Sequence, residues 1–178
     1  MQLREFYEID QNTGQWLEVH VLDIENQEIE IPLNFVEGWN EGFYSPIYDL
    51  ETKEWKEGKP LEEILEVQKV SKIEELNLIC RNEIEKGFEY NGYFFEFESH
   101  DQDNFTQTLA LLSVDPTTTN VTWKTKNQGI VNLTREEFLQ VCKKAETTKR
   151  NNIGKCWILK SEVEQATTIE EVNNITWQ

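Results

Sequence analysis

The feature that most restricts how this chain can fold is a long stripe of mostly apolar residues between Pro60 and Gly87. Its members recur at alternating steps of three and four residues, which is typical of a helix with one buried face. Pro60 suits the first turn of a helix, and Gly87 suits its end. The spacing predicts a helix over residues 60–86, about 40 Å long. The stripe consists of Val70, Ile73, Asn77, Cys80 and Ile84.

This helix is long for a chain of 178 residues. Part of it could connect two modules, or the stripe could pair with a second copy of the chain. Only about two regular heptads are visible, fewer than a coiled coil requires. Self-association through the stripe is therefore a hypothesis, and a homo-oligomer is one expected form of the protein.

The chain before the helix has the patterns of short strands. Residues 3–9 and 15–22, joined by turn-forming residues 10–14, predict a hairpin, and residues 28–36 predict a further extended piece. Residues 39–58 predict two short extended pieces joined by a turn at residues 49–53. Residues 1–58 carry 14 acids against 3 bases, and residues 59–178 carry 20 against 14. This asymmetry predicts a boundary near Gly58.

The chain after the helix alternates hairpin and helix signals. Asn91-Gly92 predicts a hairpin, and residues 121–133 predict a second one. Asp101 or Asp103 can cap a short helix that ends at residues 115–116. A capping box at Thr134 and Glu137 begins a long helix, and a last short helix follows residue 168. The fold class is therefore α+β, with a β-rich module (1–58) and an α+β domain (59–178) of two hairpins and helices.

Charge and composition exclude several classes of partner. The 34 acids outnumber the 17 basic residues, giving a net charge of −17. This argues against binding of nucleic acid, which needs clustered Lys and Arg, and against an anionic membrane surface. No apolar run approaches the roughly 20 residues of a membrane span, and we expect no secretory signal.

The chemistry-bearing residues form no recognised motif. Cys80, Cys142 and Cys156 are odd in number and widely spaced, so we expect small buried side chains in a protein made in a reducing cytoplasm. His20 and His100 each stand alone in the sequence. We find no nucleophile, dinucleotide or phosphate-loop motif. The sequence predicts no metal, no cofactor and no enzymatic activity.

An aromatic, glycine-punctuated segment is the clearest candidate for a binding surface. Its side chains could fill the core of a small β module, or some could remain exposed and contact another protein, as Trp and Tyr do at interface hot spots. The candidate interaction residues are Trp39, Phe43, Tyr44, Tyr48 and Trp55.

Two stretches of the chain resemble bacteriophage proteins. Residues 42–64 resemble a motif of small proteins from phage tail gene clusters, including tail-fibre and tail-fibre-assembly proteins. The matching residues are Tyr44, Pro46, Tyr48, Asp49, Trp55, Glu57, Gly58, Glu62, Glu63 and Ile64.

The second stretch, residues 80–177, resembles an uncharacterised domain family of phage and prophage tail proteins. The resemblance rests on Arg81, Ile84, Gly87, Phe88, Tyr90, Asn91 and Gly92, then Trp123, residues 127–129, Val131, Leu133, Thr134, Glu136, Glu137, Thr167, Ile175 and Trp177. We recognise nothing in the first 40 residues.

These resemblances imply a non-enzymatic component of a phage tail, baseplate or tail-like particle. Such a protein would be made in the host cytoplasm, reside in the virion and contact other tail, baseplate or fibre proteins. The alternatives are a tail-fibre assembly chaperone absent from the mature particle and, less favoured, a wall-degrading glycosidase.

Overall fold

The computed structural model describes residues 2–25, 30–38 and 42–178 and confirms a mixed α+β fold. The chain forms two compact units, Met1–Val67 and Gln68–Gln178. The division falls inside helix α1 (Leu61–Glu85), nine residues beyond the position near Gly58 at which the charge asymmetry suggests a boundary. Each unit is described separately below.

The first unit contains two small antiparallel sheets. In the first sheet β1 (Leu3–Ile9) lies between β2 (Trp16–Asp23) and β3 (Phe35–Val36). The second pairs β4 (Pro46–Asp49) with β5 (Glu54–Glu57). The β1–β2 hairpin occurs where the alternation of apolar and polar residues predicts it, and the β4–β5 hairpin occurs where two short extended pieces joined by a turn are predicted. Residues 28–29 of the extended piece predicted over residues 28–36 lie outside the described residues, and its last two residues form β3.

One tight turn joins these two sheets. Asp10 accepts the backbone N–H groups of Asn12 and Thr13 at 2.9 and 2.8 Å, which shapes the connection from β1 to β2. Gly14 has a φ of 71°, and its carbonyl accepts the backbone N–H of Tyr48 at 2.8 Å. A Cβ at this position would lie 1.9 Å from the Tyr48 carbonyl oxygen, so the close approach requires glycine.

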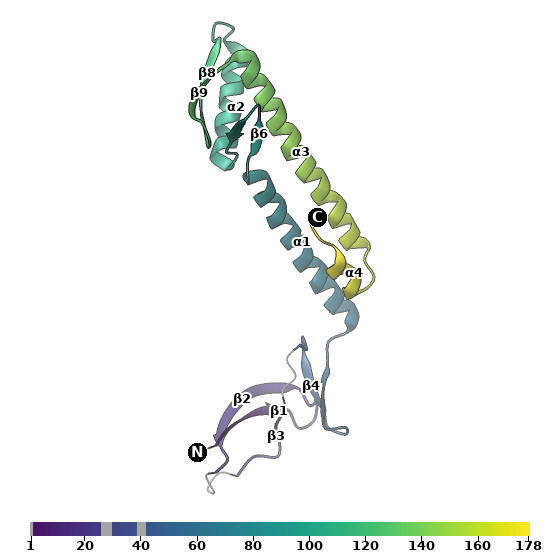
Figure 1. Cartoon of the computed structure of the whole chain (residues 1–178). Helices are drawn as coiled ribbons and strands as arrows, with labels where there is room; N and C mark the ends of the chain where they lie inside the picture. The colour runs from purple at the N-terminus through teal and green to yellow at the C-terminus, as the bar shows by residue number, and fades with distance from the viewer. Residues whose placement is uncertain (1, 26–29, 39–41) are drawn as a thin grey trace. The chain divides into compact units, whose positions relative to one another are not determined.

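The second unit packs two hairpins and a helix against a pair of long helices. After α1 come β6 (Phe88–Tyr90), β7 (Tyr93–Phe95), α2 (Ser99–Val114), β8 (Asn120–Thr125), β9 (Gly129–Thr134), α3 (Arg135–Gln165) and α4 (Ile169–Asn174). Helices α1 and α3 run antiparallel, side by side (Figure 1). Contacts such as Cys80 Sγ to the Asn152 carbonyl and Lys69 Nζ to the Glu164 carbonyl fix this direction.

The core of the second unit is aromatic. Phe105 from α2 stacks on Phe138 from α3 with ring centroids 5.6 Å apart, and both contact Trp123 from β8. Phe88 and Phe95 stack across the β6–β7 hairpin at 5.4 Å. Each aromatic pair adds to the burial of apolar area. This core holds β6–β7, β8–β9, α2 and α3 together.

Local signals place most helix ends correctly, with one correction. Thr134 caps α3, and the predicted capping box with Glu137 is present. For α2, neither Asp101 nor Asp103 is the cap. The helix begins earlier, at Ser99, with Glu98 as its N-cap and Asp101 as the third residue of a capping box. The Asp101 carboxylate accepts the Glu98 backbone N–H at 3.0 Å, so Asp101 acts from inside the first turn and not as the cap.

Candidate functional site

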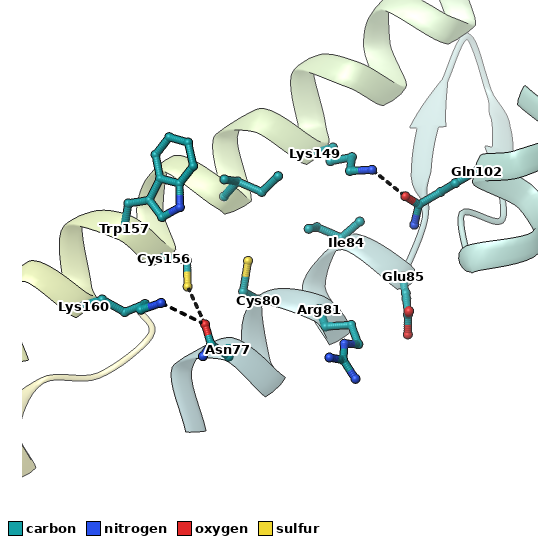
Figure 2. Close-up of a pocket in the computed structure, with 11 residues that line it drawn as sticks. Asn77, Cys80, Arg81, Ile84, Glu85, Gln102, Lys149, Cys156, Trp157 and Lys160 are labelled. Atoms are coloured by element: carbon teal, nitrogen blue, oxygen red, sulfur yellow. Dashed lines mark hydrogen bonds between the residues drawn. The ribbon is translucent and has the colours of Figure 1, made fainter. Parts of the chain in front are cut away.

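A groove of about 470 Å³ lies between α1 and α3 within the second unit. Pockets of this volume are common at ligand-binding sites. Figure 2 shows the side chains of both helices that line it, together with Gln102 from α2. The groove is lined by Asn77, Cys80, Arg81, Ile84, Glu85, Gln102, Lys149, Ile153, Cys156, Trp157 and Lys160.

The floor of the groove is apolar, and burial lowers the reactivity of its Cys80 thiol. Cys80 and Ile84 are buried on α1, and Cys156 is buried on α3. Burial, with the neighbouring Cys156 as a second cause, raises the pKa of the Cys80 thiol to about 11. The thiol therefore stays protonated at neutral pH and is a poor nucleophile. The expectation that these two cysteines are small buried side chains is confirmed.

Three cations surround this floor. Lys149 Nζ donates to Gln102 Oε1 at 2.7 Å, and Lys160 Nζ donates to Asn77 Oδ1 at 3.3 Å (Figure 2). Arg81 on α1 also lines the groove. Among the described residues, no carboxylate lies within 4 Å of any of these three charges. The two lysines therefore donate to neutral amide acceptors in a chain with 34 acids.

Trp157 stands at the rim of the groove. It follows the buried Cys156 on α3, and 70% of its surface is exposed. Neither the cation set nor Trp157 was identified from the sequence. The only signal in the sequence was the spacing of Lys149, Ile153, Cys156 and Lys160, which places them along one face of α3. Which residues of α1 lie opposite this face is decided by packing alone.

The predicted aromatic interaction residues occupy different environments. Tyr48 and Trp55 are cross-strand partners with ring centroids 5.3 Å apart, and Tyr7 packs edge-on against Trp55 at 6.0 Å. This supports the core-filling interpretation for these two side chains. Tyr44 is 45% exposed, whereas Phe43 is half-buried. Trp39 lies outside the described residues. A role in binding stays a prediction for this set.

The predicted self-association stripe is not one continuous exposed surface. Cys80 and Ile84 belong to the core of the second unit, where the same chain covers them. Val70 and Asn77 are exposed, and Ile73 is half-buried. The physical reason is that α3 packs against the later turns of α1. Self-association through the remaining residues stays a prediction.

A second apolar surface lies on the sheet of the first unit. Alternate residues of β2 share one face, and Leu17, Val19 and Val21 are 52%, 46% and 58% exposed. Leu3 of β1 is exposed on the same face. The strand order places β2 at an edge, and no strand among the described residues pairs with its outer side along residues 17–23. The alternation along β2 was visible in the sequence, but which face is covered was not.

The fold also brings His20 next to two carboxylates. Glu8 and Glu18 are direct cross-strand partners, and His20 lies on the same face two residues further along β2. His20 Nε2 is 2.9 Å from Glu8 Oε2, and the ligand atoms of all three lie within 4.8 Å of one another. Phe35 stacks on the imidazole at 4.4 Å. The group has the chemistry to hold a divalent metal ion, and the His20–Glu8 contact is also that of a surface ion pair.

Comparison with known protein families divides the chain into two modules. Two family models match it in tandem: residues 2–66 match the phage family described as the YomQ N-terminal domain, and residues 67–176 match the domain of unknown function DUF4376. The second match spans more than half of the chain, and the chain therefore belongs to the DUF4376 family. This confirms the phage origin that the resemblance implies. No curated protein and no solved structure matches the chain.

The family boundary between residues 66 and 67 lies one residue before the division between the two compact units. None of the described helices has the length and apolar character that crossing a bilayer requires.

Proposed function

We propose that this protein is a structural component of a bacteriophage tail, baseplate or tail-like particle that acts through protein–protein contacts and without catalysis. The match of residues 2–66 to a phage family supports the context. The resemblance of residues 42–64 to tail-cluster proteins favours the tail within that context. On this proposal the protein resides in the virion after synthesis in the host.

The observation that carries the proposal is the exposed apolar face of edge strand β2. An edge strand presents unpaired backbone groups, and most proteins protect such an edge with charge, proline or a covering element. Here the apolar side chains of Leu17, Val19 and Val21 on this edge strand are exposed. We infer that a strand from a neighbouring tail protein pairs with β2, as in β-strand addition, and that other side chains of the same protein cover this face.

The first experiment is mass spectrometry of particles purified from the phage or prophage that encodes the chain. Peptides from it should be present at a fixed ratio to the major tail protein. Its absence from particles, combined with binding to a fibre protein in lysates, would instead identify an assembly chaperone. Clearing of host cell walls by the pure protein, lost on neutralising one acid, would identify a glycosidase.

A second experiment tests the β2 face itself. The double variant Val19→Glu and Val21→Glu should fold normally, since both side chains are exposed, yet fail to enter particles. The double variant Gln11→Glu and Asn12→Glu adds the same charge at the exposed β1–β2 turn and should enter them. Equal incorporation of both variants would show that the face is not the contact.

A further inference from the structure

The groove between α1 and α3 lies in the second unit, and its interpretation does not depend on the proposed role in the particle. Its most unusual property is charge. Arg81, Lys149 and Lys160 have no carboxylate within 4 Å among the described residues, although acids outnumber bases two to one in the whole chain. Only Glu85 contributes a negative charge to the lining. The groove is thus a local cationic site on an acidic protein.

The spacing of the two lysines defines the shape of the ligand. Lys149 and Lys160 lie 11 residues apart on one helix, so about 16 Å separates them along its axis at 1.5 Å per residue. A single small anion cannot contact both ammonium groups. An extended peptide covers this distance with about five residues at roughly 3.3 Å each.

The centre of the groove requires an apolar group. Ile84, Ile153 and Cys156 line it between the two lysines, and the exposed Trp157, next to Cys156 on α3, also belongs to the lining. Exposed tryptophans with apolar neighbours are typical anchors of protein–protein contacts. A ligand with negative charge at both ends and apolar side chains between them complements the two lysines and the apolar residues that lie between them (Figure 2).

We propose that this groove binds an extended acidic segment of another protein, with carboxylates at Lys149 and Lys160 and apolar side chains against Trp157. Each carboxylate replaces a neutral amide as the acceptor of a lysine ammonium group, and a charge-assisted hydrogen bond is the stronger of the two. Arg81 contacts the same segment from α1.

The test uses the full-length protein and two fluorescein-labelled peptides. The acidic probe is Gly-Glu-Glu-Ser-Leu-Leu-Ser-Glu-Glu-Gly, and the basic probe has lysine in place of each glutamate. Fluorescence anisotropy should show saturable binding of the acidic probe that weakens with added salt. An equal concentration of free glutamate should not compete.

Charge reversal provides the decisive comparison. The double variant Lys149→Glu and Lys160→Glu should bind the acidic probe at least tenfold more weakly and gain affinity for the basic probe. The double variant Lys143→Glu and Lys144→Glu makes the same charge change at exposed positions of α3 outside the groove and should bind as the unaltered protein does. Trp157→Ala removes an exposed side chain and should weaken binding several-fold even if the lysine variant folds poorly.

Three results of the binding experiments would overturn the proposal. These are no saturable binding of the acidic probe at millimolar concentration, equal loss of affinity in the two double variants, and competition by free glutamate at the concentration of the peptide. Light scattering provides a further check on the lysine variant. If this variant differed from the unaltered protein only in its oligomeric mass, the groove would be a contact between copies of this chain, and the proposal would be wrong.

Discussion

At the scale of single residues, short polar side chains shape the ends of the helices. Asp115 follows α2 and accepts the hydroxyl groups of Thr117 and Thr118 at 2.6 and 2.7 Å. The hydrogen bonds, with the Thr117 hydroxyl as the largest cause, lower the pKa of Asp115 from 3.8 to about 2. These bonds favour the charged form of the carboxylate in the folded state.

This shift predicts a pH dependence of the free energy of unfolding. A lowered pKa in the folded state means that the stabilisation is complete above pH 4 and is lost as the pH falls from about 4 to about 2. The difference in stability between the unaltered protein and Asp115→Asn should therefore shrink over that interval. Urea unfolding of both proteins at pH 5, 3.5 and 2.5 measures it, and a constant difference would contradict the assignment.

The aromatic core predicts a large effect for one substitution. Phe138 is fully buried against Phe105 and Trp123, so Phe138→Ala should lower the free energy of unfolding by about 3–5 kcal/mol. Its neighbour Leu139 is 37% exposed and is the matched control, with an expected loss below about 2 kcal/mol for Leu139→Ala. Denaturant unfolding compares the two, and similar losses would contradict the core described above.

At the scale of elements, the connection from α1 to β6 depends on one glycine. Gly87 has a φ of 85°, and its backbone lies against the Phe95 carbonyl of the neighbouring strand β7. The position thus ends the helix and allows the β6–β7 hairpin to begin at once. Gly92 has a similar φ of 78° in the hairpin turn, with nothing within 4 Å of an added Cβ.

Alanine substitutions at these two glycines distinguish the cost of backbone strain from the cost of a steric clash. Gly92→Ala should cost about 1–2 kcal/mol, the penalty of a left-handed conformation for a residue with a Cβ. Gly87→Ala should cost clearly more, because its Cβ would lie 2.2 Å from the Phe95 carbonyl oxygen. Thermal unfolding of the two variants gives the comparison, and equal losses would show that the close approach is not present in solution.

At the scale of the whole molecule, each matched family corresponds to one compact unit. The connected aromatic core draws all its buried members from residues 80–156, within the second unit. Its stability therefore rests on residues of that unit. The first unit is built from two small sheets joined at Gly14.

We expect the fragment of residues 59–178, which retains all of α1, to fold without the first unit. Near-ultraviolet circular dichroism should show ordered aromatic side chains and a cooperative thermal transition. Phe138→Ala should destabilise the fragment and the full chain by the same amount. A fragment with helical signal but no cooperative transition would contradict the assignment of the core to this unit.

The sequence predicted the elements well and the candidate site poorly. The helix from Pro60 to Gly87, the hairpin turn at Asn91-Gly92 and the capping box at Thr134 all appear where local patterns place them. The N-cap of α2 was missed because glutamate is a weak capping signal and Asp101 is a strong one. The cations of the groove were missed because Arg81 comes from a different helix than Lys149 and Lys160.

By itself, the sequence determined the kinds of element, their order and most of their ends, because these depend on hydrogen bonds and side-chain spacing within a few residues. Only the tertiary structure decided which apolar faces are covered: α3 buries Cys80 and Ile84, whereas Val19 and Val21 stay exposed. It also decided which charges meet in the groove. Both outcomes depend on how elements distant in the sequence pack, and no local pattern contains that information.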